Sequence, residues 1–254
     1  MAPRLEAFAV PGLPMVQPEA NVATLINEAL ERNGQTLADG DVVCIAQKIV
    51  SKAENRQVAL ASVEPGAEAC ELAQAVDKDP RLVQLILDES TEVLRHKPGV
   101  LIVRHRLGIV GANAGIDQSN IDHGEAEEAL LLPIDPDGSA ASIRADLEAS
   151  HGCRLAVMIT DSHNRPWRLG TVGACIGCAG LAPLDDHRGG TDLYGRELKV
   201  TLINRADAIA SIATLLMGET TEQLPVAVVR GLGPETAPAP ATTIVRPPAE
   251  DLFR

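Results

Sequence analysis

The sequence predicts a protein of the α/β to α+β class, with mixed sheets and packed helices. Short apolar runs of strand length mix with amphipathic segments of helical length, but strict βαβ alternation does not occur. The 254 residues are 45% apolar and only 2% aromatic, so the core is built mainly from Ala, Val, Leu and Ile. Neither GxxxxGK[ST] nor a GxGxxG that follows a strand is present, which argues against a P-loop or Rossmann fold.

Periodicity and end signals define the individual elements. Between residues 19 and 33, apolar side chains recur at helical spacing, and Asn33-Gly34 ends the pattern. Short apolar runs bounded by polar or turn residues indicate buried strands. Helices are expected at 19–33, 68–77, 79–89, 138–150 and 205–217. Strands are expected at 41–46, 100–103, 154–159, 199–203 and 225–230.

Length and composition bound the organisation of the chain. We expect a single catalytic unit over residues 1–254, and a division into two intertwined subdomains stays open. A stretch rich in Pro and Ala, 232–245, is expected as a linker before the C-terminal tail. Five scattered cysteines fit reduced thiols, and the lone Cys175-Ile-Gly-Cys178 pair is expected to pack as small apolar side chains.

Charge and hydropathy exclude several classes of partner. The formal net charge is -13 and no basic run occurs, which argues against a nucleic-acid partner. No apolar stretch approaches the ~20 residues that a membrane span needs. The N-terminus lacks the apolar region of a signal peptide, so a cytoplasmic location is expected. Small anions must be attracted locally, by metal ions and a few placed Lys and Arg side chains.

The segment Thr160–Arg168, TDSHNRPWR, carries the most chemical information. It follows the strand expected at 154–159, which delivers Asp161 and Ser162 to its carboxyl end. Carboxylate and hydroxyl oxygens are ligands that Mg²⁺ and Mn²⁺ prefer. The alternative is that Asp161 merely caps a turn.

Two arginines and the single tryptophan complete this segment. The guanidinium groups of Arg165 and Arg168 suit phosphate or carboxylate oxygens, although solvated loop arginines are the alternative. Trp167 is expected in the core or in a pocket wall. Upstream, Gln47–Lys52 places two Lys and a Ser just past the strand expected at 41–46. Together these features predict a metal-assisted site for anionic substrates.

Several segments occur in an order that is more specific than any one of them. They include VPGLP at 10–14, QKIVSKAE at 47–54, AGIDQSN at 114–120, TDSHNRPWR at 160–168, MGE at 217–219 and RPPAEDLFR at 246–254. From about residue 8 to the C-terminus the chain resembles the coenzyme F420-0:L-glutamate ligase family, of the CofE type. The resemblance implies a CofE-like fold and a homodimer.

The resemblance also implies a reaction. GTP would activate a carboxylate of the deazaflavin coenzyme precursor F420-0 as an acyl phosphate, and the amine of L-glutamate would then form an amide. Two divalent cations per site, Mg²⁺ or Mn²⁺, are implied, and K⁺ is a further cation of such enzymes. Ser162 stands where Thr is usual, and His163-Asn164 departs from the family pattern, which could alter the acceptor pocket or merely the turn.

The family's functional positions carry over onto this sequence by motif. The implied catalytic residues are Asp117, Asp161, Arg165 and Arg168. The implied metal ligands are Asp117, Asp161, Ser162 and Glu219. The implied nucleotide contacts are Leu13, Pro14, Met15, Val16, Gln47, Lys48, Lys52, Asn120, Met217 and Gly218.

Three other readings stay open. The protein could be a related metal-dependent ligase that joins an amino acid to a different acid, and residues 163–164 are then the feature that matters. It could be a catalytically silent nucleotide-binding paralogue, although Asp117, Asp161, Lys52 and Asn120 together argue against that. A metal-dependent phosphohydrolase would use the same metals but would need no site for an amine.

Overall fold

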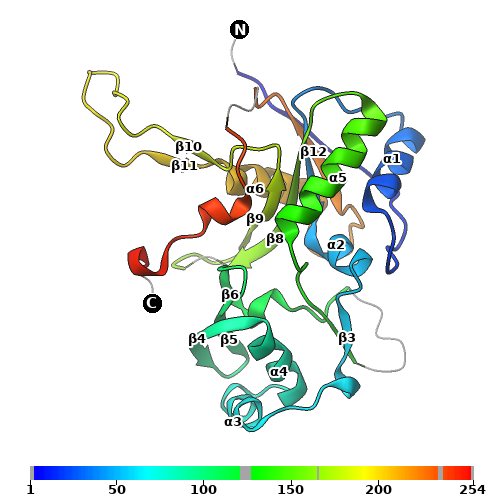
Figure 1. Cartoon of the computed structure of the whole chain (residues 1–254), viewed down its shortest axis with the longest axis vertical. Coiled ribbons are helices and arrows are strands. Elements are labelled where there is room, and N and C mark those ends of the chain that lie inside the picture. Colours follow the sequence, from blue (N-terminus) through cyan, green and yellow to red (C-terminus); the bar gives the residue numbers. More distant parts are fainter. Residues whose placement is uncertain (1–2, 121–126, 165, 234–236, 253–254) are drawn as a thin grey trace.

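The structure is a computed structural model of the chain and describes residues 3–120, 127–164, 166–233 and 237–252 (Figure 1). Its largest sheet consists, in spatial order, of β1 (Glu6–Ala9), β12 (Val226–Arg230), β2 (Val42–Ala46), β8 (Ala156–Asn164) and β9 (Thr171–Ala179). Within this sheet β2 and β8 run parallel, whereas the other neighbouring pairs are antiparallel. This mixed sheet and its packed helices confirm the predicted fold class.

Helices cover both faces of the large sheet (Figure 1). Successive side chains of a strand point to opposite faces. Val43 and Ile45 therefore join one apolar core, while Val42 and Cys44 join the core on the other face. The first core contains α1 (Val22–Arg32), α2 (Gln47–Ala53) and α5 (Pro136–His151), and the second contains α6 (Arg205–Met217). The sheet is thus the middle layer of three.

The start of α5 illustrates how local sequence sets a boundary. The helix begins at Pro136, two residues before the predicted start, because Pro is well tolerated in the first turn. The side chain of Asp135 accepts a hydrogen bond from the backbone N–H of Gly138 and caps the helix. At the other end, Gly152 adopts a left-handed conformation with φ of 65° and terminates it.

A second lobe, at the bottom of Figure 1, has an apolar core of its own. It contains α3 (Ala67–Val76), α4 (Pro80–Asp88) and the sheet β4 (Ser90–Lys97), β5 (Val100–His105) and β6 (Val110–Ala112). The pair β3 (Gln57–Ala59) and β7 (Glu128–Leu130) and the short 3₁₀ turns η1 (Leu60–Ser62) and η2 (Asn113–Gly115) complete the lobe. The sequence did not predict β4, because two register shifts interrupt its alternation of apolar and polar residues.

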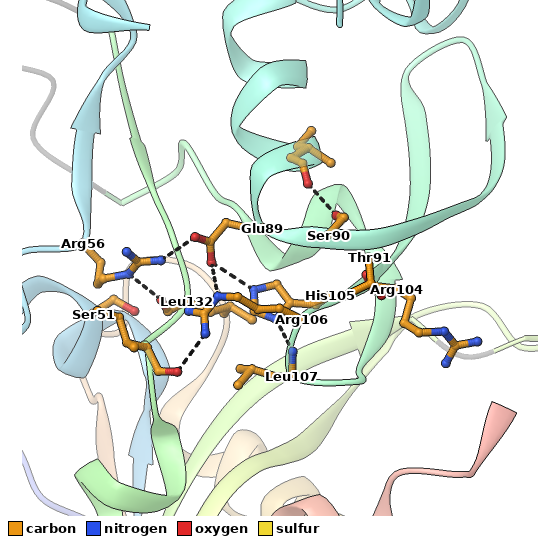
Figure 2. A network of polar contacts seen from close by, with 12 residues as sticks. Ser51, Arg56, Glu89, Ser90, Thr91, Arg104, His105, Arg106, Leu107 and Leu132 are labelled. Atoms are coloured by element: carbon orange, nitrogen blue, oxygen red, sulfur yellow. Dashed lines mark hydrogen bonds and ion pairs between the residues drawn. The ribbon is translucent and has the colours of Figure 1, made fainter. Parts of the chain in front are cut away.

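A polar network around Glu89 ties this lobe to the rest of the molecule (Figure 2). Its carboxylate lies 2.9 Å from Nη2 of Arg56, 3.1 Å from Nε of Arg106 and 3.2 Å from Nε2 of His105. Burial acts to raise the pKa of Glu89, but the hydrogen bonds from His105 and Arg56 and the positive charges outweigh it and lower the pKa to about 2. Arg56 Nε also donates to the backbone oxygen of Leu132, which leads toward α5.

The region after β9 forms an arm and a tail. The antiparallel pair β10 (Leu184–Asp186) and β11 (Leu202–Asn204) is the base of an arm that projects away from the body (Figure 1). This β11 is shorter than the strand expected at 199–203. In the stretch 232–245, residues 234–236 lie outside the described part, while η3 (Ala241–Ile244) packs Ala241 into the second core. The turn η4 (Pro248–Glu250) follows.

Two further expectations can be compared with the structure. All five cysteines are free thiols, and Cys175 and Cys178 are buried in the second core, as predicted. Among the described residues, no helix has the length and apolar character needed to cross a membrane.

Candidate active site

The parallel strands β2 and β8 bring two predicted segments to one edge of the sheet. Ala46 at the end of β2 pairs with Thr160 of β8, so the chain beyond each residue emerges at the same edge. Helix α2 starts immediately at Gln47, whose buried side chain accepts a hydrogen bond of 2.8 Å from the Ser51 hydroxyl. Lys48 and Lys52 stand one turn apart on this helix. The edge therefore carries two lysines opposite the polar residues of β8.

The TDSHNRPWR segment is a strand for half its length, which corrects the prediction. Strand β8 was expected to end at Ile159, yet it continues to Asn164 because Asp161 and Ser162 pair with Ala174 and Gly173 of β9. The partner strand supplies backbone hydrogen bonds that the apolar pattern of the sequence does not reveal. Asp161 and Ser162 consequently stand on a paired strand, which holds a side chain more firmly than a loop does.

The loop after η2 supplies the opposite wall. Asp117 is fixed by mutual backbone hydrogen bonds with Leu130, and Asn120 adopts φ of 54°. Gly115 has φ of 67°, and a Cβ added there would lie 2.9 Å from a methyl carbon of Leu132. Glycine is the residue that fits both demands, so the AGID segment folds tightly enough to present Asp117.

Ion pairs and hydrogen bonds join this loop to α2 and to the segment after α6. Lys48 Nζ lies 2.6 Å from Oδ2 of Asp117, and Lys52 Nζ donates to the backbone oxygen of Asn120 at 2.9 Å. Asn120 Nδ2 in turn donates to the backbone oxygen of Thr220 at 3.1 Å. Burial acts to raise the pKa of Asp117, but hydrogen bonds from Lys48 and Ser119 hold it below its usual value.

The third wall begins at the end of α6. Met217 is its last, buried residue, and Gly218 with φ of 72° turns the chain. Glu219 then accepts a hydrogen bond from the hydroxyl of Ser162 on β8. The predicted metal ligand Glu219 is thus brought to the predicted metal ligand Ser162 by the packing of α6 across the sheet.

Asp161 has a neighbour that the sequence singled out as unusual. The Nε2 atom of His163 lies 3.5 Å from Oδ2 of Asp161. Burial acts to lower the pKa of His163, but the contact with Asp161 and the charge of Asp207 outweigh it, so the pKa is raised. His163 therefore contacts the side chain of a predicted metal ligand directly.

These walls enclose a cavity of about 810 Å³. Its lining contains every predicted metal ligand and every predicted nucleotide contact. These are Leu13, Pro14, Met15, Val16, Gln47, Lys48, Lys52, Asp117, Asn120, Asp161, Ser162, Met217, Gly218 and Glu219. Thr160 and Ser119, which were not predicted, also line it. The segment 220–225 lines it as well, in keeping with the resemblance, which implies that the chain from Met217 onward forms a wall of the nucleotide site.

The structure does not bring Arg168 into this cavity. Arg165 lies outside the described residues. Arg168 is exposed in the turn between β8 and β9 and is not part of the cavity lining, so its catalytic role stays a prediction. Trp167 in the same turn is 88% exposed, which overturns the expectation that it lies in the core or in a pocket wall.

The predicted metal ligands share the cavity without forming one tight cluster. Among the described residues, no three His, Cys, Asp or Glu side chains are grouped closely enough to hold an ion. Each acidic ligand instead contacts a different neighbour: Asp117 contacts Lys48, Asp161 contacts His163, and Glu219 contacts Ser162. All the candidate ligand atoms are oxygens, which is the chemistry that hard cations require.

Fold and site together define a three-layer α/β protein with a lysine- and carboxylate-lined cavity at the end of two parallel strands. The chain matches the model of the F420-0:Gamma-glutamyl ligase family over residues 12–231 and belongs to that family. It is 42% identical over 252 residues to the coenzyme F420:L-glutamate ligase of Methanothermobacter thermautotrophicus, a match that covers 98% of this chain and 99% of that protein.

Two more relatives carry the same name. The coenzyme F420:L-glutamate ligase of Methanopyrus kandleri is 42% identical over 256 residues, which cover 99% of this chain and 98% of that protein. The corresponding ligase of Archaeoglobus fulgidus is 41% identical over 251 residues, with 99% and 97% covered. The similarity therefore extends over the whole chain, with both lobes included.

Proposed function

We propose that this protein is a ligase that adds L-glutamate to the deazaflavin coenzyme F420-0, with consumption of GTP and dependence on divalent metal. The observation that carries the proposal is the convergence of Asp117, Asp161 and Glu219 with Lys48 and Lys52 in one cavity. The names of the relatives support the choice of acceptor and amino acid. Carboxylates for cations and lysines for phosphates are the groups that a nucleotide-dependent ligase needs.

The reaction requires that a carboxylate be activated. A carboxylate does not react with an amine at neutral pH, so a carboxylate oxygen of F420-0 first attacks the γ-phosphorus of GTP. This step gives an acyl phosphate and GDP. The deprotonated amine of glutamate then attacks the acyl carbon, the amide bond forms, and inorganic phosphate leaves. The protein contributes mainly by positioning the reactants and by neutralising charge.

The donor set fits two divalent cations. Asp117, Asp161, Ser162 and Glu219 would hold Mg²⁺ or Mn²⁺ through oxygen atoms, and K⁺ is a further cation we expect. When bound, the divalent cations would supply charge neutralisation at the phosphate oxygens.

The lysines and the cavity walls act on the nucleotide. Lys48 and Lys52 point toward the loop of Asp117 and Asn120, where their ammonium groups can bind phosphate oxygens. The nucleotide would contact the chain along Leu13–Val16 and Met217–Gly218, which line the same cavity. The net charge of -13 makes these two local cations more important for the attraction of an anion.

Carboxylates on the substrates call for cationic partners outside the nucleotide part of the cavity. We assign this role to Arg165 and Arg168, which follow β8 beyond Asp161 and Ser162. A guanidinium group can bind a carboxylate through two hydrogen bonds and so fix its orientation. Because His163 contacts Asp161, a change at residue 163 would alter the surroundings of a predicted metal ligand.

A homodimer is part of the proposal. Leu193, Tyr194 and Val200 of the arm are 98%, 95% and 86% exposed, and the arm projects from the body (Figure 1). Trp167, in the turn between β8 and β9, is a further exposed aromatic side chain. Large apolar side chains that gather on a projecting element are typical of a surface that another protein covers. A second copy of the chain is the partner that the family resemblance implies.

One reaction mixture tests the proposed activity. The protein is incubated with F420-0, L-glutamate, GTP and Mn²⁺, and the acceptor is examined by mass spectrometry. We expect a gain of one or more glutamyl units that requires GTP and metal. Phosphate release without glutamyl transfer would point to a phosphohydrolase, transfer to other acids alone would point to a related ligase, and neither reaction would point to a silent nucleotide-binding protein.

A further inference from the structure

The carboxylate of Asp117 is already occupied by partners from the chain itself. Its Oδ1 atom accepts the backbone N–H of Ser119 at 2.7 Å. Its Oδ2 atom accepts the Ser119 hydroxyl at 3.0 Å and lies 2.6 Å from Nζ of Lys48. The Lys48 ammonium also donates to the hydroxyl and to the backbone oxygen of Ser119, at 3.1 and 3.3 Å. A single positive charge therefore sits among three oxygens of the Asp117 loop.

We propose that the Lys48 ammonium occupies the position of a divalent cation at Asp117 while no nucleotide is bound. The metal then binds tightly at Asp117 only after nucleotide phosphates draw Lys48 away. This inference rests on the proposed function, because it needs a metal and a nucleotide that share this cavity. Lys48 would then have two roles. It would contact the phosphates, and it would cause the nucleotide to bind before the metal at Asp117.

Charge and burial favour this arrangement. The side chains of Lys48 and Asp117 are only 27% and 35% exposed, so an unpaired Asp117 carboxylate would be poorly solvated. A lysine is suited to the task because its ammonium is a compact charge on a flexible stem and can move to a new partner. Two cations at hydrogen-bonding distance from one oxygen atom repel each other strongly, so Lys48 and a metal ion compete for Oδ2.

The second lysine of α2 provides an internal comparison. Lys52 Nζ donates to the backbone oxygen of Asn120, at 2.9 Å. Both lysines face the same loop, yet the ion pair with the predicted metal ligand is made by Lys48. Replacement of Lys52 should therefore weaken nucleotide binding without a gain in metal affinity. Replacement of Lys48 by a neutral residue should weaken nucleotide binding and also raise the affinity for the metal.

Thermodynamic linkage gives the inference a second consequence. If GTP removes a competitor of the metal, GTP must raise the affinity for the metal, and the metal must raise the affinity for GTP by the same factor. Part of this coupling comes from direct contact between phosphates and metal. The part that comes from Lys48 disappears when the lysine is replaced, so the coupling factor becomes smaller.

The test measures metal affinity in the absence of nucleotide. Free Mn²⁺ is quantified by electron paramagnetic resonance during titration of the full chain and of the variants Lys48→Gln, Lys48→Arg and Lys52→Gln. We expect Lys48→Gln to bind Mn²⁺ about tenfold more tightly than the original chain, since it removes a charged hydrogen bond that competes for Asp117. Lys48→Arg keeps the charge and Lys52→Gln keeps the ion pair, so both should stay within about twofold of the original chain.

The double variant Lys48→Gln with Asp117→Asn locates the effect, because the gain must vanish when the carboxylate is gone. An unchanged or weaker affinity of Lys48→Gln for Mn²⁺ overturns the inference, and so does an equal gain in Lys52→Gln. Melting temperatures of all variants verify that each one is folded. Glutamyl transfer by the original chain is measured separately, so that a failure of the proposed function is distinguished from a failure of this inference.

Discussion

The hydroxyl of Ser162 donates a hydrogen bond to the carboxylate of Glu219, although 57 positions separate the two residues. Ser162 stands on β8 at the end of the parallel strand pair, and Glu219 follows the last turn of α6. The buried Met217 anchors that helix end against the sheet, and the positive φ of Gly218 directs the chain back to the cavity. The packing of α6 thus sets the position of one predicted metal ligand relative to another.

Asp161→Asn should nearly abolish glutamyl transfer. The amide keeps the shape of the side chain but removes the charge that would hold a cation, and the loss of one charge-stabilising group commonly lowers the rate by roughly 10² to 10³. Initial rates at saturating Mn²⁺ check the expectation. Asp146→Asn, on the exposed face of α5, is the matched control and should keep its rate. Turnover of Asp161→Asn at the original rate would remove Asp161 from the metal site.

Lys52→Ala should weaken the binding of GTP more than the binding of the acceptor. A hydrogen bond to a charged group contributes about 1.5–3 kcal/mol, so the dissociation constant of GTP should rise on the order of tenfold to a hundredfold. Isothermal titration calorimetry with GTP measures the change, and a parallel titration with F420-0 is the control. An unchanged affinity for GTP would contradict the assignment of Lys52.

The mixed sheet, most helices and the residues of the cavity could be predicted from the sequence. The long helices and the central strands carry strong apolar periodicity, and the short motifs of the family resemblance identified residues that line the cavity. The continuation of β8 through Asp161 and Ser162 could not be predicted in this way, because it depends on pairing with β9. Strand β4 was missed for a similar reason, since its bulges break the alternation that identifies a strand.

The pairings inside the cavity were also beyond the reach of the sequence. Lys48 and Asp117 are separated by 69 positions in the numbering, and only the meeting of α2 with the second lobe brings them together. The wrong expectation for Trp167 has a physical cause of the same kind. Its aromatic ring indicates burial in general, but whether a turn packs on its own chain or projects from it is decided by tertiary structure.

Glu89→Gln should destabilise the fold at neutral pH. The substitution leaves Arg56 and Arg106 without the carboxylate that they share in Figure 2, and breaking a largely buried ion pair costs on the order of 3 kcal/mol. Urea unfolding at pH 7 measures the free energy. Glu92→Gln is the control, because Glu92 pairs with Arg104 but its side chain is 51% exposed, and its loss should cost less than about 1 kcal/mol.

The same variant should reveal a dependence on pH. The pKa of Glu89 is lowered in the folded protein to about 2, from the 4.5 that is usual for a glutamate side chain. Its contribution is therefore present in full above the unfolded value and is lost as the pH falls from about 4.5 toward 2. The difference in unfolding free energy between the original chain and Glu89→Gln should shrink over that interval. A difference that is constant down to pH 3 would contradict the role given to the ionised carboxylate.

Leu193→Ser combined with Tyr194→Ser should weaken a dimer that forms through the arm. Both side chains are almost fully exposed in one chain, and aromatic or apolar anchors of an interface often contribute about 2 kcal/mol or more. Sedimentation equilibrium should show the dimer mass for the original chain and a shift toward monomer for the variant. Ile134→Ser, at an exposed apolar position outside the arm, is the control. A monomeric original chain at micromolar concentration would rule the homodimer out.

Divalent metal and GTP together should raise the melting temperature more than the sum of their separate effects. Asp117, Asp161 and Glu219 line one cavity, so a cation bound there would be attracted by several negative charges. A ligand that binds only the folded state stabilises it by about 2.7 kcal/mol at a hundredfold excess over its dissociation constant, which is roughly 5–10 °C for a chain of this size. In the proposed mechanism, nucleotide phosphates would provide further oxygen ligands for the metals, so each ligand would strengthen the binding of the other. Monovalent salt at matched ionic strength only screens charge and should raise the melting temperature less.

Independent, additive shifts for Mn²⁺ and GTP would mean that the two do not share a site, and the metal-dependent ligase mechanism would lose its basis.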